Sequence, residues 1–366
     1  MNNIKRLSFI FILLFVLVSA CQPAPAAVPT AEIKQVEVTR VVAGTPIIEQ
    51  IIVTATPAPV EEKPFKVAVI LPSTIKDLEW SQSLYEGLVK VQKEMGGESK
   101  LQIALSEDAW DVTNAAAAIR DYANEGFNLI IAHGAQYGTT LQQIAPEFPE
   151  ASFAWGTTTQ TFQADGITNV FAYQPEAQQS GYVTGVIAAL MTKSKVVGVT
   201  GPIEAGDARL YNQGFAMGVQ ATDPKVKVNI SYTGSFSDVT LMSAAAETHI
   251  KAGADILTGT SQSMVGAVSV AKDNNALWMS GSGWHQASLA PDNVPVEVVY
   301  NWDVILRDMI KSNKAGVPGG KVYFMTFKNG GLEIFYNDKL IPADVKAKAE
   351  ETIKGINDGT IKIEIK

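Results

Sequence analysis

Hydrophobic positions along residues 65–173 recur in short runs that alternate with longer amphipathic stretches. The runs have the length of buried strands and read FKVAVIL, LQIAL, FNLIIAHG, SFAWG and NVFAY. Between them, residues 80–95, 111–124 and 138–147 carry apolar residues at helical spacing. Such alternation is typical of a parallel sheet with crossover helices. The pattern predicts a first α/β lobe over residues 65–172.

The same alternation continues and predicts a second lobe over residues 173–281. Its strands read KVVGVTG, VKVNISY, ADILTG and ALWMSG, and its helices are expected at 177–192, 207–221, 239–252 and 262–274. Residues 282–318, which include VEVVYNWDVILRDMI, are expected to return to the first lobe. Residues 319–366 are expected to complete the second lobe, with a hairpin over KVYFMTFKNGGLEIFY that turns at Asn329-Gly330-Gly331 and a helix near 343–357.

Two α/β lobes joined by several crossings create a cleft, which is where a ligand is expected. Ligands of such sheets bind outside the carboxyl ends of the strands. The residues that follow the predicted strands are rich in aromatic, hydroxyl, amide and glycine types and poor in charge. This lining fits a neutral, flat, partly polar ligand better than a phosphate or a metal ion.

The N-terminus has the pattern of an export signal. Lys5 and Arg6 precede an apolar stretch over residues 7–18 that is too short to span a bilayer. It ends in Val-Ser-Ala before Cys21, the only cysteine, and so resembles the lipobox of bacterial lipoproteins. Residues 1–21 are therefore predicted to be a lipoprotein signal peptide, with lipid on Cys21 as the membrane anchor. A plain secretory signal is the alternative.

Residues 22–64 differ in composition from both their neighbours. They are dominated by Pro, Ala, Val, Thr and Glu, which favours an extended linker between the anchor and the lobes. Their Val, Thr and Ile runs could instead pair as strands.

Charge and motif content exclude several classes of function. The chain is 46% hydrophobic and 18% charged, its formal net charge is -8, and no basic stripe is present, so no nucleic-acid partner is expected. The three histidines, His133, His249 and His285, lack metal-ligand spacing. No complete nucleophile elbow or Walker loop occurs, and the adjacent carboxylates Glu107 and Asp108 would point apart on an extended chain. We expect no metal, no cofactor and no enzymatic activity.

Several motifs resemble one known family. DLEWSQ and SLYEGL (residues 77–88) are similar to the D-x-x-F-N-Q-x-x-x-E-G-L region of the basic membrane protein family, the purine-nucleoside-receptor-like lipoproteins that serve ABC transporters. Further matches follow in the same order, namely GFNLII (126–131), GYVTGVIAALMTK (181–193), NQGFAMG (212–218) and GSFSD (234–238).

This resemblance implies a fold, a location and partners. The fold would be the type I periplasmic-binding fold, a monomer of two Rossmann-like lobes with a hinge and a ligand cleft between them, which closes on its ligand. The protein would be a membrane-anchored lipoprotein on the extracytoplasmic side of the membrane. It would deliver a small molecule to an ABC permease and its ATPase.

The resemblance also implies ligand contacts. In nucleoside-binding members the base is stacked between two aromatic residues, which correspond here to Trp80 and Phe236. The Asn after the first aromatic is replaced by Ser81. An Asp that grips the ribose is replaced by Ser282, and a Lys that contacts the ribose is replaced by Tyr300. The loss of this charged clamp favours a purine base over a nucleoside.

The remaining expected contacts surround the ring. Trp302 or Trp284 would help enclose it, and Asp77, Gln136 and Asp238 would read its polar edge. The full expected set of ligand-binding residues is Asp77, Trp80, Ser81, Gln82, Gln136, Tyr137, Phe236, Asp238, Ser282, Trp284, Tyr300 and Trp302.

Some of these residues could have a purely structural role, and the protein could have a different function. Trp80, Leu84, Leu88 and Val91 form a helical stripe, so Trp80 could be an ordinary core residue. Asp238 could be a helix N-cap. The protein could also be a sensory or surface receptor lipoprotein of the same fold, or an importer receptor for another small solute such as a sugar.

Overall fold

The computed structural model describes residues 33–42, 45–54 and 63–365, which fall into two units. In the first unit, β1 (Ile33–Val42) pairs antiparallel with β2 (Thr45–Thr54). Here the linker expected over residues 22–64 contains a strand pair, as its Val, Thr and Ile runs allowed. The predicted signal peptide and Cys21 lie outside the described residues.

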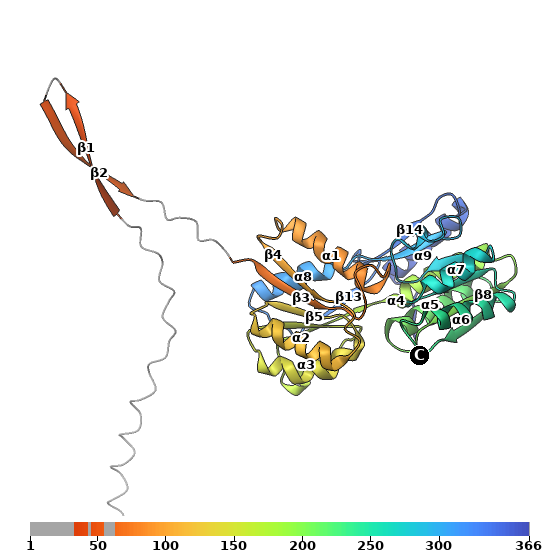
Figure 1. The fold of residues 1–366 in the computed structure, drawn as a ribbon. Coiled ribbons are helices and arrows are strands. Elements are labelled where there is room, and N and C mark those ends of the chain that lie inside the picture. Colours follow the sequence, from red (N-terminus) through yellow and green to blue (C-terminus); the bar gives the residue numbers. More distant parts are fainter. Residues whose placement is uncertain (1–32, 43–44, 55–62, 366) are drawn as a thin grey trace, which may run out of the picture. The chain divides into compact units, whose positions relative to one another are not determined.

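The first lobe of the second unit contains a six-stranded parallel sheet (Figure 1). Its order is β13-β7-β6-β5-β3-β4. The strands are β3 (Phe65–Ile70), β4 (Leu101–Ser106), β5 (Leu129–Ala132), β6 (Ser152–Gly156), β7 (Val170–Pro175) and β13 (Val322–Met325). The helices are α1 (Trp80–Glu94), α2 (Val112–Asn124), α3 (Gly138–Ile144) and α8 (Asp303–Lys314).

The second lobe contains a six-stranded sheet in the order β14-β12-β11-β10-β8-β9, in which only β14 runs antiparallel to its neighbour. The strands are β8 (Val196–Gly201), β9 (Lys227–Tyr232), β10 (Ile256–Gly259), β11 (Leu277–Ser280), β12 (Val296–Tyr300) and β14 (Leu332–Tyr336). The helices are α4 (Ala177–Met191), α5 (Gly206–Thr222), α6 (Val239–Lys251), α7 (Val265–Asp273) and α9 (Ala343–Asp358).

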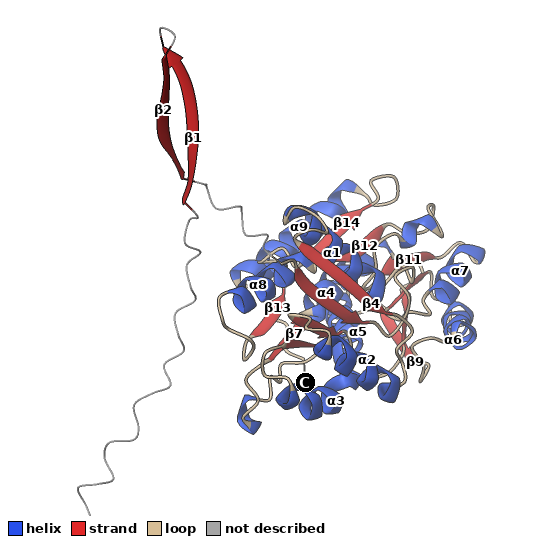
Figure 2. Ribbon diagram, turned by 60° about the vertical axis from the view of Figure 1, so that its left-hand side comes forward, coloured by secondary structure: helices blue, strands red, loops and turns tan. Residues whose placement is uncertain are grey.

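Helices flank both sheets because the strands are apolar on both faces (Figure 2). In β3, Val67 and Val69 belong to the same hydrophobic cluster as Leu84 of α1. The alternate residue Ile70 belongs to a second cluster with Ile119 of α2. This period of two places one helix layer on each side of the sheet.

The C-terminal third departs from the sequence prediction in the sheet that β12 and β13 join and in the partner of β14. β12, in the segment expected to return to the first lobe, lies in the second sheet, between β11 and β14. The predicted hairpin is wrong because β13 pairs with β7 in the first sheet, whereas β14 pairs with β12 in the second. The apolar runs were identified correctly, but a strand's partner depends on contacts far along the chain.

Helices α4 and α5 approach unusually closely through four glycines. A Cβ atom on Gly181 or Gly185 of α4 would lie 2.2 Å from a carbonyl oxygen of α5. A Cβ on Gly214 or Gly218 of α5 would lie 2.3 or 2.1 Å from a carbonyl oxygen of α4. The glycines of GYVTGVIAALMTK and NQGFAMG therefore allow backbone-to-backbone packing of two helices in the second lobe.

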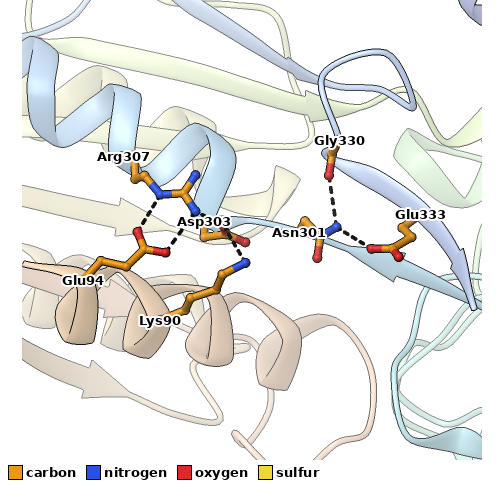
Figure 3. Close-up of polar contacts among 7 residues, drawn as sticks. All are labelled: Lys90, Glu94, Asn301, Asp303, Arg307, Gly330 and Glu333. Carbon is orange, nitrogen blue, oxygen red and sulfur yellow. Dashed lines mark hydrogen bonds and ion pairs between the residues drawn. The ribbon is translucent and has the colours of Figure 1, made fainter.

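Polar contacts fix the crossing from β12 to α8 (Figure 3). Asn301 Nδ2 donates to the Gly330 carbonyl and to Glu333 Oε2, both at 3.0 Å. The buried Asp303 pairs with Lys90 of α1 at 2.9 Å and also with Arg307. Figure 3 shows Arg307 turned in addition toward Glu94 of α1, with Nε donating at 2.7 Å. These contacts tie α8 to α1 in the first lobe and the crossing to β14 in the second.

Candidate functional site

A cavity of about 420 Å³ lies between the two lobes, at the carboxyl ends of their strands. Every residue that lines it follows a strand of one sheet or the other, as expected for this architecture. The lining residues are Pro72, Glu79, Trp80, Trp110, His133, Gly134, Ala135, Gln136, Thr157, Pro202, Ile203, Ala205, Gly206, Asp207, Ala208, Phe236, Thr260, Ser261, Gln262 and Ser282.

Trp80 belongs both to the core and to the cavity wall. It begins α1, is 5% exposed and packs in the cluster that contains Leu84 and Leu88. Its ring stacks on His133 with centroids 4.3 Å apart and planes 10° from parallel. Its Nε1 donates to the His133 carbonyl at 3.1 Å. The indole is therefore held in one orientation by its partners.

His133 orients Trp80 as a neutral imidazole. It is fully buried at the end of β5, and burial lowers its pKa to about 3. A neutral ring has one donor and one acceptor. Nε2 donates to the Trp80 carbonyl at 3.1 Å, and Nδ1 accepts from the Tyr173 hydroxyl at 2.8 Å. This histidine supports the wall and carries no charge into the cavity.

The second lobe contributes an aromatic side chain opposite those of the first. Phe236 lies in the loop between β9 and α6, and its ring centroid is 5.6 Å from that of Trp110 at a tilt of 35°. Both side chains are partly exposed and line the cavity. Trp110 was not among the expected ligand contacts because it lies next to the helix expected over residues 111–124, although its position soon after β4 was the available signal.

Two carboxyl groups line the cavity, one from each lobe. Glu79 is 3% exposed and lies in the loop before α1, while Asp207 is in the first turn of α5. Burial raises the pKa of Glu79 to about 8 and that of Asp207 to about 6. Sequence reasoning selected Asp77 from this loop and missed Glu79.

The rest of the lining is neutral and includes polar atoms without a hydrogen-bond partner among the described residues. None of the lining residues, all of them in the described part of the chain, is lysine or arginine. Thr260 Oγ1 and Gln262 Oε1 are buried and have no hydrogen-bond partner within residues 63–365. Buried polar atoms normally have partners, so these two are available to a ligand.

Asp77, Ser81 and Gln82 stabilise the loop that carries Glu79. Asp77 Oδ1 accepts from the backbone N–H groups of Glu79 and Gln82, and Oδ2 accepts from that of Ser81. Gln82 Oε1 accepts from the Leu78 N–H at 2.9 Å. None of the three side chains belongs to the cavity lining, whereas Trp80, Gln136, Phe236 and Ser282 do.

Three further predicted residues pack around the site. Tyr137 is fully buried, and its hydroxyl donates to the Ala109 carbonyl at 2.8 Å. Trp302 is fully buried edge-on to Trp80, with centroids 5.1 Å apart, and its Nε1 donates to Ser83 Oγ. Tyr300 also lies edge-on to Trp80, at 6.2 Å.

Trp284 and Asp238 lie elsewhere. Trp284 packs edge-on against Phe335, with centroids 5.0 Å apart, beside a separate cavity of about 230 Å³. Asp238 is the N-cap of α6, where its Oδ1 accepts from the Leu241 N–H at 3.0 Å. This is the capping role that the sequence offered as the alternative to a ligand contact.

The described residues offer neither a metal site nor a membrane-spanning helix. They contain no cluster of three or more histidine, cysteine or acidic side chains that could hold a metal ion. Nor do they include a helix with the length and hydropathy needed to cross a bilayer.

Comparison with known proteins identifies the family. Residues 65–365 match the family described as ABC transporter substrate-binding protein PnrA-like. This chain belongs to that family. The PnrA-like proteins are solute-binding components of ABC transporters rather than enzymes, and they bind small molecules for delivery to a permease from the extracytoplasmic side.

Individual relatives agree with this assignment. Basic membrane protein A2 of Borrelia garinii is 26% identical over 78% of this chain and 84% of its own. A purine-binding protein of Brucella abortus is 28% identical over 82% of this chain and 83% of its own. Among solved structures, an ABC transporter solute-binding protein from Conexibacter woesei is similar with a TM-score of 0.67 and 21% identity, over 82% of this chain and 98% of its own. The fold is thus that of periplasmic-type solute-binding proteins.

Proposed function

We propose that this PnrA-like protein binds a purine base in the cavity between its lobes and delivers it to an ABC permease. The observation that carries the proposal is the cavity wall: Trp80 and Trp110 come from the first lobe, Phe236 from the second, and no cationic side chain lies among the lining residues described. Stacking on aromatic side chains contributes about 1 to 3 kcal/mol per base. Two such contacts would supply much of the roughly 8 kcal/mol that micromolar binding requires.

The cavity's polar groups favour a base over a nucleoside. Ser282, which stands where the family's ribose-binding members have an acid, donates its hydroxyl to Glu79. Tyr300 is 4% exposed and its hydroxyl has no partner within residues 63–365. A ribose diol would therefore find no acid–lysine clamp at these two positions. The purine-binding relative from Brucella abortus supports the same class of ligand.

The location we propose is that of a lipoprotein. Lipid chains on Cys21 would anchor a monomer to the extracytoplasmic face of the membrane, where a permease and its ATPase would accept the purine. The support is the lipobox-like sequence before Cys21.

A thermal-shift panel on the full chain tests the ligand class. The panel contains adenine, guanine, hypoxanthine, their nucleosides, ribose and amino acids. A purine base at a hundredfold excess over its Kd should add about 2.7 kcal/mol to the free energy of unfolding, which raises the Tm by several degrees. Ribose and amino acids should leave the Tm unchanged.

Other outcomes of the panel identify the alternatives. A shift with a sugar but with no purine would contradict the proposal and favour an importer receptor for another solute. Nucleosides that bind more tightly than bases would refute the argument from Ser282 and Tyr300. The second candidate function is that of a sensory receptor of the same fold. One relative, 26% identical over 82% of this chain and 90% of its own, is a transcriptional activator protein of Bacillus subtilis. A kinase or cyclase gene beside this one, in place of a permease gene, would support the sensory role.

A further inference from the structure

The Glu79 carboxyl joins the two lobes. The residue belongs to the first lobe, yet its Oε1 accepts from the Ser261 N–H at 3.1 Å and from the Ser282 hydroxyl, both in the second lobe. Within residues 63–365, its Oε2 accepts only from the Trp80 N–H, at 3.0 Å. Because Oε1 already has two donors, Oε2 is the oxygen with remaining capacity to form a hydrogen bond.

The groups around Glu79 leave its charge without a counter-ion. Asp77 of the same loop and Asp207 of α5 are acidic, and Tyr300 of β12 and His133 after β5 are neutral. Burial, together with the negative charges of Asp77 and Asp207, raises the pKa of Glu79 to about 8. The hydrogen bonds from Ser282 and from the Trp80 N–H oppose this shift but do not outweigh it. A buried carboxyl in such surroundings favours its neutral form at pH 7.

We propose that Glu79 is a specificity-determining residue that donates a hydrogen bond from Oε2 to an acceptor atom of the ligand, such as a ring nitrogen of a purine. This inference rests on the proposed function and adds the chemistry of recognition. Asp207 and Gln262 Oε1 are acceptors in the same cavity, so the site offers both a donor and acceptors. An aminopurine, with ring nitrogens beside N–H groups, matches that pattern.

Closure of the lobes would then be coupled to uptake of a proton. When the lobes are apart, Glu79 loses Ser261 and Ser282 and gains water, so its pKa should return toward the ordinary value of 4.5. The closed state then binds the proton more tightly than the open state between pH 4.5 and about 8. Across that window the affinity for the ligand should fall as the pH rises, by up to about tenfold per pH unit.

Calorimetric titration of the full chain with adenine at pH 7 tests this coupling. Guanine or hypoxanthine replaces adenine if the panel shows that either binds more tightly. The titration is run in phosphate and in Tris, whose ionisation enthalpies differ, so that the heat of proton uptake can be separated. The wild type should take up close to one proton per purine. Glu79→Gln keeps a donor at this position and should bind within a few-fold of the wild type with no proton uptake.

Glu86→Gln is the matched control, because Glu86 lies on α1 but outside the ligand cavity. This variant should take up protons like the wild type. Glu79→Ala, which removes the donor, should weaken purine binding at least tenfold. If Glu79→Gln does not fold, the pH dependence of the wild-type affinity between pH 7 and 8, which lies above the pKa of Asp207, gives the same information.

Each remaining outcome has a definite meaning. Purine binding by the wild type without proton uptake, or equal uptake by the wild type and Glu79→Gln, would overturn the role of Glu79 and leave the proposed function standing. A wild-type affinity that does not change between pH 7 and 8 would do the same. If no purine of the panel binds, the proposed function fails, and this inference fails with it.

Discussion

Trp80 illustrates how one side chain can meet two structural requirements. The helical stripe placed it in the core, and its position after the first strand placed it at the cleft. The two interpretations are compatible because Trp80 is the first residue of α1, next to the loop that follows the carboxyl end of β3. The contact with His133 fixes the indole before any ligand arrives, which lowers the entropic cost of binding.

Substitution of Trp110 tests whether this residue contributes to ligand binding as part of the cavity wall or to stability as part of the core. Trp110→Ala removes a partly exposed ring of the cavity wall and should weaken adenine binding about tenfold, with little change in the free energy of unfolding. Calorimetric titration and urea denaturation measure the two quantities. Equal adenine affinity in the variant and the wild type would exclude Trp110 from the site.

Trp302→Ala is the matched control because this indole is fully buried beside Trp80 and does not line the cavity. It should lower the free energy of unfolding by about 3 to 5 kcal/mol.

At the scale of single residues, the sequence located the loops better than the side chains. Trp80, Gln136, Phe236 and Ser282 could be predicted as lining residues because each follows a strand. Glu79 was missed because loop geometry decides which side chain of a loop enters a cleft. Leu78 has a φ of 57°, a left-handed conformation that sequence reasoning did not anticipate.

At the scale of elements, the family-specific motifs GYVTGVIAALMTK and NQGFAMG serve to pack two helices together. Gly181 and Gly185 on α4 face Gly214 and Gly218 on α5, and each lies against backbone of the other helix. Although these segments carried much of the family resemblance, they place helices rather than contact a ligand. They shape the second lobe, which presents one side of the cleft.

Gly185→Ala tests that contact. In a helix without the contact, alanine would stabilise the protein by about 1 kcal/mol relative to glycine. Here the new Cβ would lie 2.2 Å from the Phe215 carbonyl oxygen. The free energy of unfolding, measured by urea denaturation, should therefore fall by about 1 to 3 kcal/mol. An increase would show that the helices separate without cost.

Leu190→Ala on the exposed face of α4 is the control for this experiment. Its side chain is 44% exposed, so the free energy of unfolding should change by no more than about 0.5 kcal/mol.

Element type could be predicted along most of the chain, but strand partners could not be predicted throughout. The helices and strands from β3 to β11 follow from hydrophobic periodicity. The errors concern the sheet that β12 and β13 join and the partner of β14, which lies in the second sheet as expected. An apolar strand can pair in either sheet, and the choice depends on the length and direction of the connecting loops.

At the scale of the whole molecule, the two lobes are coupled more strongly than their separate sheets suggest. The chain crosses between them after β7, after β12 and after β13. In addition, Leu78 of the first lobe packs in a hydrophobic cluster of the second, where its carbonyl accepts from Gln286 Nε2. Glu79 adds its contacts with Ser261 and Ser282.

We therefore expect the two lobes to unfold in one transition. In differential scanning calorimetry of the full chain, the calorimetric and van't Hoff enthalpies of the lobes' transition should agree. The physical reason is that each lobe would lose an edge strand or an interlobe contact if the other lobe unfolded. Two well-separated transitions, one per lobe, would contradict this expectation.

The exchange of edge strands also limits how such a protein can evolve. The C-terminal segment supplies β13 to the first sheet and β14 to the second, so neither lobe is encoded by one continuous stretch of gene. A recombination event that joined the first lobe of one relative to the second lobe of another at a single break between β7 and β13 would combine a foreign edge strand with the first sheet. Lobes of this architecture are therefore expected to be inherited together, and new ligand preferences to arise by substitution in the loops after the strands.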